Sequence, residues 1–191
     1  TRPVVMESIP DTYIKSVKFA PKMSGGKWSA AIEAVICNIS GNDAHVMVCS
    51  ELNGVTARSE EVEIKAGSET IVSYEREFDN VKAWSNAEPN LYMLDTQLLI
   101  NGEPVDDMIE RVGFRTVEVR GQKIYVNGEA IYLKGFNRHE DYAQAGCAVP
   151  LQLMAQDMDL MQDMGANAVR TCHYPNDERF LDMCDERGIF V

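Results

Sequence analysis

The pattern of apolar and polar positions changes its period part-way along the chain. Residues 12–112 contain short runs rich in β-branched and apolar residues, such as WSAAIEAVICNIS (28–40) and AHVMVCSEL (44–52). Turn-forming residues separate these runs, at Gly41–Asp43, Gly67, Asn101 and Gly102. About seven short strands at regular spacing are typical of two antiparallel sheets packed face to face. The pattern therefore predicts an all-β sandwich over residues 12–112.

After residue 112 the spacing becomes partly helical. The segment GQKIYVNGEAIYLKG (121–135) predicts a hairpin that turns at Asn127 and Gly128. A helix is predicted next, because apolar residues recur at helical spacing at Leu151, Met154, Met158, Met161 and Met164. A short buried strand follows in ANAVRTCHY (166–174). The segment NDERFLDMCDERG (176–188) predicts a second helix, with Asn176 as its N-cap and Gly188 at its end. The final residues, IFV, begin a further strand.

The resulting order from about residue 130 is strand, helix, strand, helix, strand. Such alternation predicts a parallel sheet with right-handed crossovers. A closed β/α barrel needs roughly 200 residues or more, and residues 113–191 are fewer than half of that. We therefore expect the N-terminal part of an α/β barrel, incomplete within this chain. Its uncovered sheet should expose apolar surface.

Composition narrows the classes of partner. The net charge of −12 argues against nucleic acid or an anionic membrane as partner. No apolar run is long enough to span a membrane. Residues 1–11 lack the features of a signal peptide, and their two prolines favour an extended linker. The five cysteines form no CxxC pair, so we expect free thiols, no metal site and a cytoplasmic location.

Polar side chains crowd the ends of two predicted strands. Arg138 and His139 lie in KGFNRHED, which follows AIYL, and Arg170 and His173 lie in RTCHYPND. Because the C-terminal ends of neighbouring parallel strands share one rim, both sets should face one pocket. Such groups suit a ligand that is rich in hydroxyls, with or without a carboxylate. The two segments therefore predict one rim that carries two histidines and two guanidiniums.

Each of these residues also has a structural interpretation. A histidine at a strand end is often only a hydrogen-bonding residue, and Arg170 could pair with a buried acid. Asn137 could belong to a turn, while Glu140 and Asp141 could form a solvated loop. His45 begins a strand in the sandwich and is expected at the surface.

Longer motifs carry a resemblance to a known family. The segments GFRTVEVRGQKIYVNGEAIYLKGFNRHED, GANAVRTCHYPND and LDMCDERGIFV resemble glycoside hydrolase family 2, the β-galactosidases and β-glucuronidases. WSNAEPNLYMLDTQL resembles the end of that family's immunoglobulin-like domain. The resemblance implies a linker from an N-terminal jelly-roll domain (1–11), an immunoglobulin-like sandwich (12–112) and the N-terminal part of a TIM-barrel catalytic domain (113–191).

The resemblance also implies an activity. Members of the family are retaining exo-β-glycosidases, which use an acid/base glutamate and a nucleophilic glutamate about 5 Å apart. The family's acid/base follows an asparagine, and the chain contains no Asn-Glu dipeptide. Both glutamates are therefore expected beyond Val191, which leaves this piece without a catalytic residue and inactive alone. The substrate-binding residues implied are His139, His173, Arg170, Asn137 and Asp141.

The residues leave the substrate open. NRHEDYAQAG leans towards β-glucuronides, with β-galactosides as the alternative. A non-catalytic carbohydrate-binding or interaction module is the other class considered. It is disfavoured because the sandwich half shows no aromatic platform: Trp28 and Trp84 stand apart and are both expected in cores. No cofactor is expected, although galactosidases of the family often bind magnesium and sodium. The parent protein is expected to form a homo-oligomer.

Overall fold

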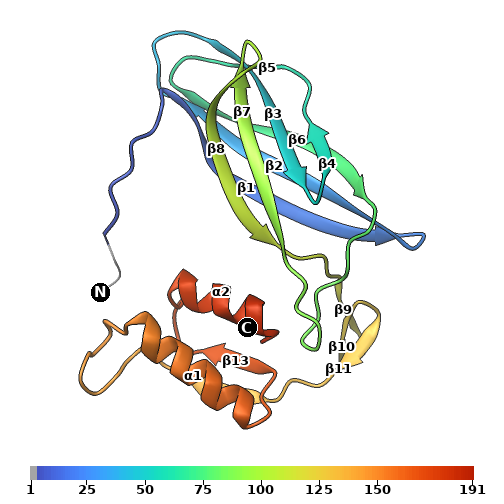
Figure 1. The fold of residues 1–191 in the computed structure, drawn as a ribbon, viewed down its shortest axis with the longest axis vertical. Coiled ribbons are helices and arrows are strands. Elements are labelled where there is room, and N and C mark those ends of the chain that lie inside the picture. The colour runs from blue at the N-terminus through green and yellow to red at the C-terminus, as the bar shows by residue number, and fades with distance from the viewer. Residues whose placement is uncertain (1–3) are drawn as a thin grey trace. The chain divides into compact units, whose positions relative to one another are not determined.

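The computed structural model describes residues 4–191, which divide into two compact units (Figure 1). The sandwich unit comprises residues 6–82 and 92–114, and the barrel unit comprises residues 4–5, 83–91 and 115–191. The predicted linker, residues 1–11, is described only from residue 4, and residues 4–11 form no helix or strand. Residues 83–91 lie inside the sequence range predicted for the sandwich but group with the barrel unit.

Two antiparallel sheets form the sandwich unit, as the sequence predicts. One sheet has the order β1-β2-β6, from β1 (Thr12–Ser24), β2 (Lys27–Asn38) and β6 (Ser68–Phe78). The other has the order β4-β3-β7-β8, from β4 (Val55–Arg58), β3 (Ala44–Leu52), β7 (Tyr92–Ile100) and β8 (Glu103–Val112). The short strand β5 (Val62–Ile64) also pairs with β3.

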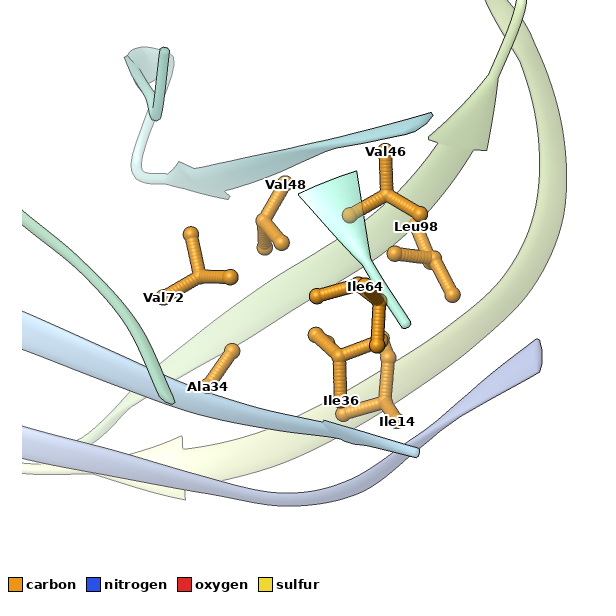
Figure 2. Packing of buried hydrophobic residues seen from close by; sticks show 8 residues of the cluster. All are labelled: Ile14, Ala34, Ile36, Val46, Val48, Ile64, Val72 and Leu98. Carbon is orange, nitrogen blue, oxygen red and sulfur yellow. The ribbon is translucent and has the colours of Figure 1, made fainter. Parts of the chain in front are cut away.

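Alternate residues of the long strands fill the space between the sheets. Along β2, Ala30, Ile32, Ala34 and Ile36 are fully buried, while the residues between them are only partly buried. Figure 2 shows one part of this core, formed by Ile14, Ala34, Ile36, Val46, Val48, Ile64, Val72 and Leu98. Burial of each large aliphatic side chain contributes about 1.5–3 kcal/mol. A register slip of one residue would turn this set outward, so the core fixes the strand pairing.

The predicted hairpin turns form where Asn-Gly pairs occur. Asn101 and Gly102 have φ values of 54° and 82°, and they connect β7 to β8. Asn127 and Gly128 have φ values of 52° and 83° in the barrel unit. Two consecutive positive φ values match the right-handed twist of the flanking strands, and asparagine and glycine tolerate them best.

The barrel unit begins with a small antiparallel sheet and continues as parallel strands and helices. Its antiparallel strands are β9 (Val117–Arg120), β10 (Lys123–Val126) and β11 (Glu129–Ile131). The elements that follow are β12 (Gly135–Arg138), α1 (Leu151–Asp163), β13 (Ala168–Thr171) and α2 (Glu178–Arg187). Strands β12 and β13 are parallel, and Phe190 forms a further parallel bridge to Ala168. The predicted alternation of strands and helices is therefore confirmed.

The position of the first parallel strand differs from the sequence interpretation. The strand that pairs with β13 is Gly135–Arg138 itself, not the preceding AIYL. The sequence did not indicate this strand, because Asn137 and Arg138 are both polar and therefore do not give the alternation of apolar and polar residues that is typical of a strand. Gly135 is required here for packing: a Cβ at this position would collide with the backbone carbonyl of Ala168 on β13.

Helices α1 and α2 lie beside β13 (Figure 1). They pack on one another and on β13 through the middle of the methionine stripe. Met154, Met158 and Met161 are buried together with Phe180 and Cys184, and burial raises the pKa of Cys184 to about 12. The ends of the stripe were predicted wrongly, because Leu151 and Met164 are exposed. Among residues 4–191, no helix is long and apolar enough to cross a membrane.

The sequence predicted the C-terminal cap of α2 correctly, but its N-terminal cap is a neighbouring residue. Gly188 ends the helix in the left-handed conformation, with φ 70°. The N-cap is Asp177, whose carboxylate accepts a hydrogen bond from the Arg179 amide at 3.0 Å. The prediction of Asn176 as cap was wrong, because a buried arginine side chain binds Asn176 instead.

The segment 83–91 is built into the barrel unit by Trp84. This side chain is buried, as predicted, and its indole N–H donates to the Asp185 carbonyl at 2.7 Å. The Trp84 carbonyl accepts a hydrogen bond from Asn127 Nδ2 at 3.0 Å. Gly188 lies so close to the Asn86 carbonyl that a Cβ there would collide with it. The segment is therefore an integral part of the barrel unit.

Candidate functional site

The parallel strands β12 and β13 place two of the predicted site residues side by side. Asn137 and Arg170 are register partners in the parallel pair, so their side chains leave the same face of the sheet. Both residues are exposed. Val169, which alternates with Arg170, is buried in the core with the helices. Asn137 and Arg170 therefore lie on the face that the helices leave open.

A hollow of about 430 Å³ lies against these strands. Asn137 and Arg170 line it together with Leu133, Phe136 and Phe190, among other residues. Leu133 and Phe136 are among the exposed large hydrophobic residues. The expected apolar surface at the open sheet is thus observed, with one amide and one guanidinium within it.

The two predicted histidines meet just beyond the C-terminal ends of the strands. Their ring centroids lie 5.5 Å apart, with the planes of His139 and His173 at 83° to one another. Both side chains are exposed. The last predicted residue, Asp141, is also exposed, and it lines a second hollow of about 330 Å³ with Asn137 and His139 beside α1. The structure thus gathers all five predicted residues around the end of this strand pair.

Arg138 does not lie on the rim, contrary to the sequence interpretation. It is only 7% exposed and points to the helix side of the sheet. Its Nε donates to Asp157 Oδ2 at 2.9 Å, and its Nη1 donates to Asn176 Oδ1 at 2.7 Å. The guanidinium carbon lies 4.0 Å from the ring centroid of Phe180. Arg138 therefore joins the end of β12 to both helices.

Glu140 is also buried, so the interpretation of this residue as part of a solvated loop was wrong. Its Oε1 accepts a hydrogen bond from the Asp177 amide at 2.8 Å, and its own amide donates to Tyr174 Oη at 2.9 Å. Asp177 in turn hydrogen-bonds the Arg179 side chain, which raises the pKa of that guanidinium. Glu140 thereby fixes the segment that follows β13.

Arg138 and Glu140 are two residues beside the candidate site whose burial the sequence did not indicate. They flank His139 on either side, and both are buried while His139 is exposed. This buried-exposed-buried pattern is the period of an extended chain. The sequence Arg-His-Glu gave no signal of this pattern, because all three side chains are polar. Two anchored neighbours hold the His139 backbone in place.

Cys172 lies close to both histidines. Its side chain is 1% exposed, and the peptide bond between Cys172 and His173 is cis. Arg170 Nη1 lies 3.3 Å from Cys172 Sγ, and the thiol in turn contacts the Arg170 carbonyl at 3.6 Å. Potential ligand atoms of His139, Cys172 and His173 all lie within 4.8 Å of one another. These three side chains could hold a metal ion.

Family models match nearly all of the chain. Residues 12–115 match the model described as glycosyl hydrolases family 2, and residues 117–191 match its TIM barrel domain. The chain belongs to glycosyl hydrolase family 2. The predicted family and the order of a sandwich followed by the start of a TIM barrel are therefore confirmed.

Relatives of this chain are named for different sugar substrates. A protein of Formosa agariphila provisionally named beta-glucuronidase is 35% identical over 100% of this chain and 23% of its own length. A beta-galactosidase of Thermoanaerobacter pseudethanolicus is 34% identical over 100% of this chain and 26% of its own. The chain thus spans about a quarter of the length of these curated relatives.

A solved structure gives a comparison at similar identity. The family 2 beta-galacturonidase of Eisenbergiella tayi, crystallised with galacturonate, is 36% identical to the present chain. The two superpose with a TM-score of 0.89 over 95% of this chain and 33% of that one. Both units of the present chain therefore have counterparts within a longer enzyme of the family.

Proposed function

We propose that the full-length protein is a retaining exo-β-glycosidase that releases terminal β-linked hexuronic acids, foremost β-glucuronides, and that this chain supplies one wall of its sugar pocket. The observation that carries the proposal is the meeting of His139 and His173 at the ends of paired strands whose open face presents Asn137 and Arg170. Imidazole and amide groups both donate and accept hydrogen bonds, as a ring of sugar hydroxyls requires.

The proposed division of roles follows the geometry. His139 and His173 bind sugar hydroxyls from the strand ends, and Asp141 lies beside the second hollow as a further acceptor. Asn137 and Arg170 reach the pocket from the sheet face below. Arg138 and Glu140 act as positioning residues for His139 through their buried contacts. We place the acid/base and the nucleophile outside residues 1–191, consistent with the lack of an Asn-Glu dipeptide.

Arg170 presents a guanidinium that is suited to a carboxylate in the proposed pocket. Its side chain is exposed, and no carboxylate among residues 4–191 forms an ion pair with it, which removes pairing with a buried acid inside the described chain as an explanation. An arginine without an anionic partner, in a chain of net charge −12, is available to a carboxylate supplied from elsewhere. That carboxylate is either the uronate or the nucleophile, whose pKa the guanidinium would lower.

A second candidate substrate is a β-galactoside. The Thermoanaerobacter pseudethanolicus relative, which carries the name beta-galactosidase, is almost as similar to this chain as the relatives named for uronic acids. The histidine pair suits either sugar, because both present vicinal hydroxyls. The two candidates differ in charge, and the experiment below separates them on that basis.

The test compares p-nitrophenyl β-glucuronide, β-galacturonide and β-galactoside as substrates of the full-length protein. We expect the uronides to be turned over faster than the galactoside, and the 191-residue chain to be inactive. His139→Ala and His173→Ala should each lower kcat/KM by about 10²-fold or more, equal to about 2.7 kcal/mol of lost transition-state binding. His45→Ala is the matched control, because His45 is an exposed histidine of the sandwich unit.

Each other outcome has a definite meaning. A faster galactoside reaction would reject the uronide assignment and retain the glycosidase. Activity in the 191-residue chain would show that the placement of both glutamates is wrong. A well-folded full-length protein inactive on every β-glycoside would reject the enzyme in favour of a carbohydrate-binding module.

A further inference from the structure

The cluster of His139, Cys172 and His173 presents a set of ligands that sugar binding does not require. Hydroxyl recognition uses the imidazoles, but a buried thiol adds little to it because sulfur is a weak hydrogen-bonding group. The potential ligand atoms of the three side chains nevertheless converge within 4.8 Å of one another. We propose that His139, Cys172 and His173 form a binding site for a thiophilic divalent metal ion of the Zn²⁺ class.

The chemistry of the donors selects the class of metal. Two imidazole nitrogens and one thiolate are borderline-soft ligands, which favour Zn²⁺, Co²⁺ and Cd²⁺ over Mg²⁺ or Ca²⁺. Three protein ligands on a tetrahedral ion leave the fourth position to water or another small ligand. The sequence spacing did not indicate this site, because His139 comes from one strand end and the other two ligands from the next.

The distances require only a small adjustment. Ligand atoms on one tetrahedral Zn²⁺ lie about 3.3–3.6 Å apart, from bond lengths of about 2.0–2.1 Å to nitrogen and 2.3 Å to sulfur. The observed limit of 4.8 Å therefore calls for a contraction of roughly 1 Å. His139 and His173 are both exposed, so their rings can rotate towards Cys172 without displacing packed neighbours.

Arg170 completes the surroundings of the thiol. Its Nη1 lies 3.3 Å from Cys172 Sγ, where it can donate a charge-assisted hydrogen bond to a thiolate. When the metal binds, the Cys172 thiol loses its proton to solvent and the sulfur electron pair forms the bond to the metal. The guanidinium repels the cation, but it also stabilises the thiolate that the cation needs. Outer donors to a ligand atom tune metal sites in this way.

Metal occupancy has a consequence that rests on the proposed function. The same imidazoles cannot bind a metal and sugar hydroxyls in the same geometry. Zn²⁺ should therefore compete with sugar, so that the cluster would make the glycosidase sensitive to thiophilic metals.

The decisive experiment uses Co²⁺ as a spectroscopic probe of the full-length protein. A Cys147→Ser background removes the cysteine that is exposed among residues 4–191, which could bind metal by itself. We expect one saturable Co²⁺ per chain with a near-ultraviolet thiolate-to-cobalt charge-transfer band, displaced by Zn²⁺. Cys172→Ser should abolish the band, and His139→Ala and His173→Ala should each weaken binding by 10-fold or more. His45→Ala should leave binding unchanged.

The result that overturns the site is a protein with no saturable Co²⁺ or Zn²⁺ binding, or a band that persists in Cys172→Ser. If Cys172→Ser does not fold, as judged by circular dichroism, the two exposed histidine variants decide the question. The proposed function is tested separately by turnover of β-glycosides without metal. An active enzyme that binds no Co²⁺ rejects only the metal site, and a metal-binding protein without activity rejects only the glycosidase.

Discussion

The pairing of Arg138 with Asn176 lends itself to a quantitative test. Asn176→Leu keeps the approximate volume but removes the acceptor that lies 2.7 Å from Arg138 Nη1. The guanidinium already has one buried nitrogen, Nη2, without a hydrogen-bond partner among residues 4–191. A second unpaired N–H on a buried cation should cost about 2–3 kcal/mol of unfolding free energy in the barrel unit.

Replacing the arginine itself should cost a similar amount for other reasons. Arg138→Met leaves the buried Asn176 Oδ1 without a donor, at a cost of about 1–3 kcal/mol. The lost contact with Phe180 adds about 1 kcal/mol. The ion pair with Asp157 adds about 0–1 kcal/mol, because that carboxylate is 39% exposed and stays hydrated. Release of a desolvated charge offsets part of this sum.

The double variant distinguishes this account from simple loss of packing. With both partners apolar, no donor or acceptor of the pair remains unpaired, so the double variant should be about 2 kcal/mol more stable than the sum of the single effects predicts.

Denaturant titration of the 191-residue chain, followed by tryptophan fluorescence, measures these free energies of unfolding. A Trp28→Phe background leaves Trp84 as the only tryptophan of this chain, so the signal reports on the barrel unit. Additive effects within about 0.5 kcal/mol would refute the reasoning.

Three further predictions concern single positions. Gly135→Ala should destabilise the chain by about 2–3 kcal/mol or more, because its Cβ meets backbone that cannot move aside; Gly41→Ala, which has open space, is the neutral control in the same unfolding assay. Asp177→Ala should cost the barrel unit about 1–2 kcal/mol through loss of the helix cap, and an unchanged denaturation midpoint would contradict this. Burial raises the pKa of Tyr74 to about 12, against about 10 in the unfolded chain, so the unfolded state loses its proton first and the stability of the sandwich unit should fall as the pH rises from 10 to 12. Tyr74→Phe should flatten this alkaline loss, as followed by Trp28 fluorescence.

Features determined by neighbouring residues were predicted correctly from the sequence. Asn101-Gly102 and Asn127-Gly128 specify their turns because positive φ is a local requirement. Gly188 ends α2 for the same reason. The run rich in β-branched and apolar residues at 28–40 predicted a strand of the sandwich, and the structure places β2 there.

Features determined by distant residues were predicted less well. Asn176 and Asp177 are both capable N-caps, and the choice between them depends on Arg138, which lies 38 residues away in the sequence. Strand β12 was missed because its buried side chain is an arginine, which is polar in the sequence although Asp157 of α1 and Asn176 both accept hydrogen bonds from it in the structure. The meeting of His139 and His173 was predicted from the parallel pairing, but the convergence of Cys172 with them was not, because no local pattern indicates it.

The placement of residues 83–91 matters for how the protein is made. The indole of Trp84 donates to the carbonyl of Asp185, a residue 101 positions later in the chain. During synthesis on the ribosome, residues 83–91 and the strands on either side of them are made well before Asp185. Until Asp185 has been synthesised, the Trp84 side chain lacks this partner and stays exposed to solvent. Nascent chains that stall in this interval would present that side chain to chaperones. A protein cut after the sandwich would lack Asp185, so its Trp84 side chain would remain exposed.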